Sequence, residues 1–61
     1  MEFTKREKDV YQLLIQGKTN KQIAVYLNIS DFTVRDHVSS MLRKTGVSNR
    51  VELIAAHHLK Q

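Results

Sequence analysis

A group of side chains between residues 32 and 43 could contact the base edges of a nucleic acid if this segment is helical. The group consists of Arg35, Ser39, Phe32, Arg43 and Asp36. At 100° per residue, the last four lie within about 100° of Arg35, so all share one helix face. The Arg35 guanidinium can donate to O6 and N7 of one guanine, a contact worth roughly 1–3 kcal/mol of discrimination. Phe32 can touch a thymine methyl or pack on the preceding turn, and Asp36 can accept from cytosine N4 or pair with Arg43.

The opposite side of the same segment is apolar, as packing on a core requires. The residues on this side are Val34, Val38, Met41, Leu42 and Thr45. Ser30 can cap the segment, Asp31 suits the positive end of a helix dipole, and Gly46 can end the helix. The pattern predicts a helix over about 31–45, buried on one side and exposed on the side that carries Arg35.

A first helix is expected near the start of the chain. Thr4 and Glu7 have the spacing of a capping box, in which each side chain accepts from the other residue's backbone N–H. The apolar residues that follow at helical spacing are Val10, Leu13 and Leu14, with Tyr11 beside them. Because Gly17 can adopt the left-handed conformation that closes a helix, we expect this helix to span about 5–16.

A second capping box, made by Thr19 and Gln22, predicts a short helix over about 20–27. Its apolar residues are Ile23, Ala24 and Leu27. Asn28 tolerates positive φ better than most residues, so a sharp turn fits at residues 28 and 29. A link this short between two helices is typical of the helix-turn-helix crossing of roughly 90–120°.

A fourth helix is expected after Ser48, which we expect to cap it. Its inward side should carry Leu53, Ile54, Ala56 and Leu59. Val51 and Ala55 lie partly off that side, so this helix has more apolar surface than one buried stripe needs, which favours a partner surface. No segment alternates with a period of two, so the fold class is all-α, with four short helices in one domain over residues 1–61.

Charge and composition narrow the function further. The chain of 61 residues has a net charge of +4, and the seven basic and three acidic residues from Gly17 onward supply all of the excess. Such an uneven positive charge favours a polyanion partner, nucleic acid before a membrane surface. The absence of Cys excludes disulfides and thiolate metal sites, and no apolar run is long enough to span a membrane. We therefore expect a cytoplasmic protein.

Residues 20–39 resemble the helix-turn-helix of LuxR-type (GerE- or FixJ-type) bacterial transcription regulators. TKRE at 4–7 resembles the family's LT.RE, with Phe3 in place of its Leu, and QGKTNK at 16–21 resembles G.(S/T)NK. TVRDHV at 33–38 resembles TV(K/R).HV, and LRKTGV at 42–47 with NRVEL at 49–53 resembles L.KLGV…R.EL. Thr45 departs from the family, which usually has an apolar residue there. The resemblance implies the fold of a LuxR-type C-terminal effector domain, with the helix over 31–45 in the major groove of double-stranded DNA.

The resemblance also assigns roles to individual residues. Asp36 and Ser39 occupy positions that the family uses for base contacts, and Lys21 and Thr33 would hold the phosphate backbone. Further candidates for phosphate contacts are Ser30, Arg43, Lys44, Asn49 and Arg50. Members of the family commonly dimerise through the fourth helix, which here implicates Val51, Ala55 and His58. The resemblance implies a homodimer on DNA, with no cofactor, metal or small-molecule ligand.

Other interpretations stay open at this point. The apolar surplus of the fourth helix could make the chain a protein-interaction module, and the promoter-contacting region of a sigma factor opens with a similar LT.RE helix. A hydrolase triad of Asp36, His37 and Ser39 is disfavoured, because adjacent residues on a helix do not face each other. His57 and His58 diverge for the same reason, so a shared metal ion is not expected.

Overall fold

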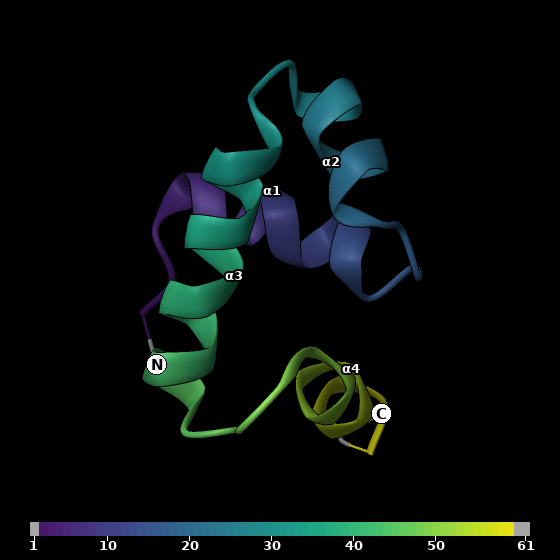
Figure 1. Cartoon of the computed structure of the whole chain (residues 1–61). Coiled ribbons are helices and arrows are strands. Elements are labelled where there is room, and N and C mark those ends of the chain that lie inside the picture. Colours follow the sequence, from purple (N-terminus) through teal and green to yellow (C-terminus); the bar gives the residue numbers. More distant parts are fainter. Residues whose placement is uncertain (1, 60–61) are drawn as a thin grey trace.

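The computed structural model describes residues 2–59, which form four helices and no strand. These are α1 (Lys5–Leu14), α2 (Asn20–Leu27), α3 (Asp31–Thr45) and α4 (Arg50–Leu59). In Figure 1, α3 runs down one side of the molecule, α1 passes behind it, α2 lies beside its upper half, and α4 lies near its lower end. The expected all-α fold with a helix-turn-helix is confirmed. None of the helices in the described part of the chain is long and apolar enough to cross a membrane.

The capping box at the start of α1 is present. The Thr4 hydroxyl accepts from the Glu7 backbone N–H at 3.1 Å, and the Glu7 carboxylate accepts from the Thr4 N–H at 2.9 Å. The expected end of this helix at residue 16 was wrong, because α1 ends at Leu14. Gly17 takes a φ of 90°, and its N–H bonds the Leu14 carbonyl at 2.9 Å, so residues 15–17 form a turn instead of continuing the helix.

The bounds of α2 and α3 agree with the sequence patterns. Thr19 and Gln22 form the second capping box. Asn28 ends α2 with a φ of 59°, and Ser30 caps α3 by accepting from the Thr33 N–H at 3.0 Å. Gly46 ends α3 with a φ of 75°.

The start of α4 differs from the expectation that Ser48 caps it. Asn49 is the residue before the helix, and its side-chain oxygen accepts from the Glu52 N–H at 2.9 Å. The Glu52 carboxylate in turn accepts from the Ser48 N–H at 2.7 Å. The capping residue is therefore Asn49 rather than Ser48, and Ser48 contributes its backbone N–H rather than its hydroxyl.

One hydrophobic core joins the four helices, and α4 contributes least to it. The buried core consists of Val10, Leu13, Leu14, Ile23, Ala24, Val34, Val38, Met41 and Leu53. Leu42 and Thr45 are only partly buried, and the Thr45 hydroxyl bonds the Met41 carbonyl of its own helix at 2.8 Å. Leu59 was expected to face inward, but it is 85% exposed, because the last turn of α4 extends past the core. The core thus buries three side chains of α3 but only Leu53 of α4, with Ile54 packed against it at partial burial.

Candidate nucleic-acid interface

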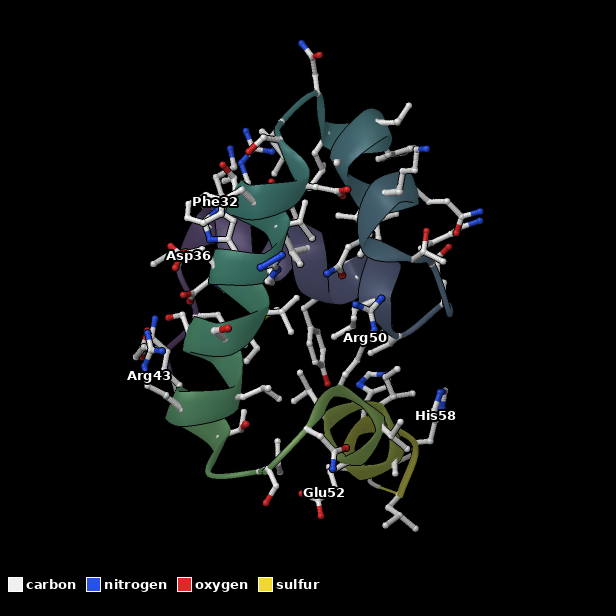
Figure 2. The ribbon with its side chains drawn as sticks, viewed as in Figure 1. Phe32, Asp36, Arg43, Arg50, Glu52 and His58 are labelled. Carbon is white, nitrogen blue, oxygen red and sulfur yellow. The ribbon has the colours of Figure 1, made fainter. Side chains whose placement is uncertain are left out.

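The five residues predicted to contact bases lie together on one exposed face of α3. Phe32, Arg35, Asp36, Ser39 and Arg43 are all exposed. Figure 2 shows Phe32, Asp36 and Arg43 projecting from the side of α3 that points away from α2. The geometry of this face therefore agrees with the expectation, while its contacts with bases stay a prediction.

The inner side of α3 explains why that face stays outward. Val34 and Met41 are completely buried, and Val38 is nearly so. Rotating α3 to hide the Arg35 face would expose these three side chains, and each fully buried aliphatic side chain contributes about 1.5–3 kcal/mol. The packing thus fixes which residues α3 presents to solvent.

Asp36 has no cationic partner among residues 2–59. The ion pairs among residues 2–59 join Arg6 to Asp9 at 3.7 Å and Lys44 to Glu7 at 2.7 Å. The alternative in which Asp36 pairs with Arg43 is therefore not what the structure contains. The Asp36 carboxylate is available to accept from a base amino group, and it would repel a nearby phosphate.

The starts of α2 and α3 carry the residues expected to bind phosphates. Lys21 is exposed in the first turn of α2. At the start of α3 the Ser30 and Thr33 hydroxyls are 2.8 Å apart and bond each other. Helix N-termini attract anions through their partial positive charge, so both positions suit a phosphate group. Asn49 is also exposed, but its side-chain oxygen already caps α4.

Lys44, a predicted phosphate contact, forms an ion pair with another residue of the protein, although its own side chain is about one third exposed. Its ammonium donates to Glu7 Oε1 at 2.7 Å, and Ser40 donates to Glu7 Oε2 at 2.7 Å. The Glu7 side chain is buried, with 4% of its surface exposed. Because this buried carboxylate needs the Lys44 charge, a phosphate would have to compete with it, and we leave Lys44 out of the proposed interface.

The environment of Glu7 perturbs its ionisation strongly. Burial by itself raises the pKa of the carboxyl, but hydrogen bonds from Lys44, the Thr4 backbone and Ser40 outweigh burial and lower the pKa from 4.5 to about 2. The Glu7 carboxylate therefore stays charged and links α1 to α3 behind the exposed face. The sequence indicated the Thr4–Glu7 box but not this second role, since Ser40 and Lys44 lie far away along the chain. Their four-residue spacing, which places both on one side of α3, was the only available signal.

Arg50, another predicted phosphate contact, also has internal partners. Its guanidinium donates to the Asn20 side-chain oxygen and to the Lys18 carbonyl. Figure 2 shows Arg50 in the space between α4 and the start of α2. Burial lowers the pKa of Arg50 from its ordinary value. The side chain thus links α4 to the first turn of α2, and any phosphate contact would have to use its remaining N–H groups.

A second link between α4 and the rest of the molecule was not expected from the sequence. The Tyr11 hydroxyl and His57 Nδ1 are 2.8 Å apart, and their rings meet edge to face with centroids 5.4 Å apart. Burial raises the pKa of the Tyr11 phenol. On the other side of α4, the predicted dimer residues Val51, Ala55 and His58 are all exposed at helical spacing. Their surface is accessible, and their contact with a second copy stays a prediction.

Comparisons with known proteins agree with the expected family resemblance. A family model described as "Bacterial regulatory proteins, luxR family" matches residues 1–57. The chain is 49% identical over 51 residues to the spore germination protein GerE of Bacillus subtilis (strain 168). This aligned region covers 84% of this chain and 69% of GerE. It is 54% identical over 48 residues to the nitrate/nitrite response regulator protein NarP of Escherichia coli (strain K12), covering 79% of this chain and 22% of NarP.

A third relative is the transcriptional regulatory protein DesR of Bacillus subtilis (strain 168). The chain is 47% identical to it over 51 residues, covering 84% of this chain and 26% of DesR. The chain therefore spans most of GerE but only about a quarter of the longer regulators NarP and DesR.

Proposed function

The chain belongs to the luxR family of bacterial regulatory proteins, and from that premise we propose that it binds double-stranded DNA in a sequence-specific manner to regulate transcription. NarP and DesR are named as regulators, which supports a function of binding rather than catalysis. The family match over residues 1–57 disfavours the sigma-factor alternative. A regulator of transcription acts where the chromosome is, so we place its site of action in the cytoplasm.

The proposed mechanism puts α3 in the major groove. That groove is about 12 Å wide, enough to admit one helix. Arg35 reads a guanine, Asp36 and Ser39 contact neighbouring base edges, and Phe32 packs on a thymine methyl. The observation that carries this proposal is the two-sided character of α3, with Val34 fully buried behind an exposed Arg35.

Phosphate contacts supply the remainder of the affinity. Lys21 in the first turn of α2, and Ser30 and Thr33 at the start of α3, supply these contacts. Contacts of this kind set position and affinity on any sequence without reading bases. Arg43 lies on the exposed side of α3 and can reach either the backbone or a base.

We further propose that two copies bind one site through α4. Val51, Ala55 and His58 form an exposed stripe at spacings of four and three residues. A two-fold axis through this stripe would place two α3 helices on successive half-sites of a symmetric operator, about one helical turn of DNA apart.

Selection of oligonucleotides from a random pool, followed by binding measurements on the selected site, tests this function. Arg35→Ala should remove discrimination between the selected site and random DNA while weak general binding remains. Lys21→Ala should weaken binding to all sequences alike and reduce the salt slope by about one unit. Arg6→Ala is the matched control, because Arg6 is an exposed arginine on α1 that pairs with Asp9.

The control should bind as the unmodified protein does. An equal loss of affinity for selected and random DNA in Arg35→Ala would contradict its role in base recognition. A pool that yields no enriched motif would contradict sequence-specific binding as a whole.

A further inference from the structure

The outer side of α2 carries apolar surface that the proposed DNA interface does not use. The large hydrophobic residues exposed among residues 2–59 are Val25, Tyr26, Phe32, Val51 and Leu59. Phe32 belongs to the α3 face, and the last two belong to α4. Val25 and Tyr26 are 76% and 75% exposed, and they adjoin each other on α2, whose core contacts come from Ile23 and Ala24. This pair therefore has no role in the core or in the proposed function.

The two residues form one wall of an open groove between the end of α1 and the outside of α2. The groove encloses about 690 Å³ and is lined by Leu13, Gln16, Lys18, Thr19, Lys21, Gln22, Val25 and Tyr26. An apolar centre with a polar rim is the usual composition of a protein–protein contact, and Tyr is enriched there. The groove is a concave surface of the kind that receives an apolar anchor from a partner.

Charge indicates the kind of partner. The lining contains two lysines and no acidic residue. Neither Lys18 nor Lys21 takes part in the ion pairs formed within the described part of the chain. The neutral side chains beside them can donate or accept hydrogen bonds. A segment that places carboxylates next to apolar side chains complements both the positive charge and the apolar surface of this groove.

Double-stranded DNA does not complement the groove between α1 and α2. Its phosphates would pair with Lys18 and Lys21, but they would leave Val25 and Tyr26 in water without an apolar partner. The labelled residues of the proposed DNA face also project from the side of α3 away from α2 (Figure 2). Lys21 alone is shared between the two surfaces.

We propose that the groove between α1 and α2 docks an acidic amphipathic segment of a partner protein, with an apolar side chain inserted beside Tyr26 and carboxylates on Lys18 and Lys21. A helix that lays its apolar side into such a groove is a common mode of peptide recognition. The site is separate from the α4 stripe. It shares Lys21 with the proposed DNA interface but includes none of the proposed dimer residues.

Selection from a displayed random library tests the proposal on the whole chain. Peptides of about 16 residues, enough for about four helical turns, would be selected against the protein. The expected result is a set of net-negative peptides with one or two large apolar residues. Tyr26→Ser and Lys18→Glu should each weaken their binding by about tenfold or more, as loss of a central anchor does. Leu59→Ser removes a comparably exposed apolar side chain from α4, outside the proposed dimer stripe, and should leave peptide binding unchanged.

A charge exchange gives a readout that general loss of structure cannot imitate. Peptides whose carboxylates are replaced by lysines should bind the Lys18→Glu protein better than they bind the original chain. Circular dichroism should show that Tyr26→Ser folds normally, because the side chain is largely exposed.

Three outcomes would overturn the proposal. The first is selection of neutral or basic peptides, or of none. The second is that Tyr26→Ser changes the sedimentation of the protein alone, which would make the groove a contact between copies of this chain. The third is a loss of DNA affinity in Tyr26→Ser as large as that in Arg35→Ala, which would assign the surface to DNA.

Discussion

The helices α3 and α4 are held in the molecule in different ways. Val34, Val38 and Met41 bury α3 in the core, while Leu53 is the one fully buried side chain of α4. Ile54 also packs against the core but is only partly buried, and two side-chain links join α4 to the rest of the molecule, Arg50 to the start of α2 and His57 to Tyr11. The helix proposed to read DNA is thus fixed by apolar packing, which tolerates little rearrangement. The helix proposed to join two copies is fixed by contacts that can open locally.

The largest effect is expected from removing the apolar anchor of α3. Met41→Ala should lower the free energy of unfolding by about 2–5 kcal/mol, because Met41 is completely buried and its truncation leaves a cavity in the core. In a domain of this size that is a large part of the total stability. Urea unfolding followed by circular dichroism measures the change.

Leu59→Ala is the matched variant on α4, since Leu59 is mostly exposed, and it should change stability by less than about 0.5 kcal/mol. A similar loss in both variants would contradict the exposed position of Leu59 and would mean that the last turn of α4 packs on the core.

A smaller effect is expected at the polar link behind α3. Glu7→Gln should cost about 1–3 kcal/mol near neutral pH, because the charged hydrogen bonds from Lys44 and Ser40 are weakened. In the native protein the pKa of Glu7 is lowered from 4.5 to about 2. Its contribution is therefore fully present above pH 4.5 and is lost as the pH falls toward 2. Thermal unfolding between pH 2 and pH 7 measures it.

The pH dependence separates Glu7 from the other carboxylates. Glu7→Gln should flatten the loss of stability on acidification, whereas Asp36→Asn, which removes an exposed carboxylate without an ion pair, should leave it in place. If Glu7→Gln loses stability with falling pH as steeply as the unmodified protein does, other groups cause this loss.

The next effect concerns the link from α4 to α2. Arg50→Ala should cost about 1 kcal/mol, because both hydrogen bonds of a partly buried guanidinium are lost. Arg50→Lys keeps the charge but cannot reach two acceptors with a planar fork, so it should restore little. Hydrogen exchange should become faster in α4 and in the first turn of α2, with α3 unchanged.

Asn20→Ala provides the other half of this test. If Arg50 and Asn20 act through each other, the double variant should lose less than the sum of the single losses. Additive losses, or faster exchange throughout α3, would contradict a local link.

The smallest effect is expected at Tyr11. Tyr11→Phe keeps the ring contacts with Phe3 and His57 but removes the hydroxyl bond to His57, so it should cost about 0.5–1.5 kcal/mol. Exchange should again quicken in α4 alone. Tyr26→Phe, at an exposed position of α2, is the control and should be neutral within about 0.5 kcal/mol.

Features set by neighbouring residues were predictable from the sequence. The bounds of α2 and α3 follow from Thr19, Asn28, Ser30 and Gly46, each of which acts within four residues of itself. The apolar side of α3 and the exposed Arg35 side follow from the same helical period. The end of α1 was misplaced because Gly17 closes a turn rather than the helix itself.

Features that join distant parts of the chain were not predictable. Glu7 and Lys44 are 37 residues apart, and Arg50 and Asn20 are 30 apart, so no periodicity relates them. Both cations were expected on phosphates because a basic residue near a DNA-binding motif has the same appearance whether its partner is internal or external. Leu59 was expected inside because helical period alone does not show where the core ends.

The position of Glu7 also determines how ionic strength acts on the molecule. Its carboxylate is buried and lies 2.7 Å from the Lys44 ammonium, so mobile ions have little access to the carboxylate. Contacts with a phosphate backbone are formed in solvent and weaken steeply as counterions accumulate. Concentrated salt should therefore detach this domain from nucleic acid while leaving it fully folded, so that release and denaturation occur under separate conditions.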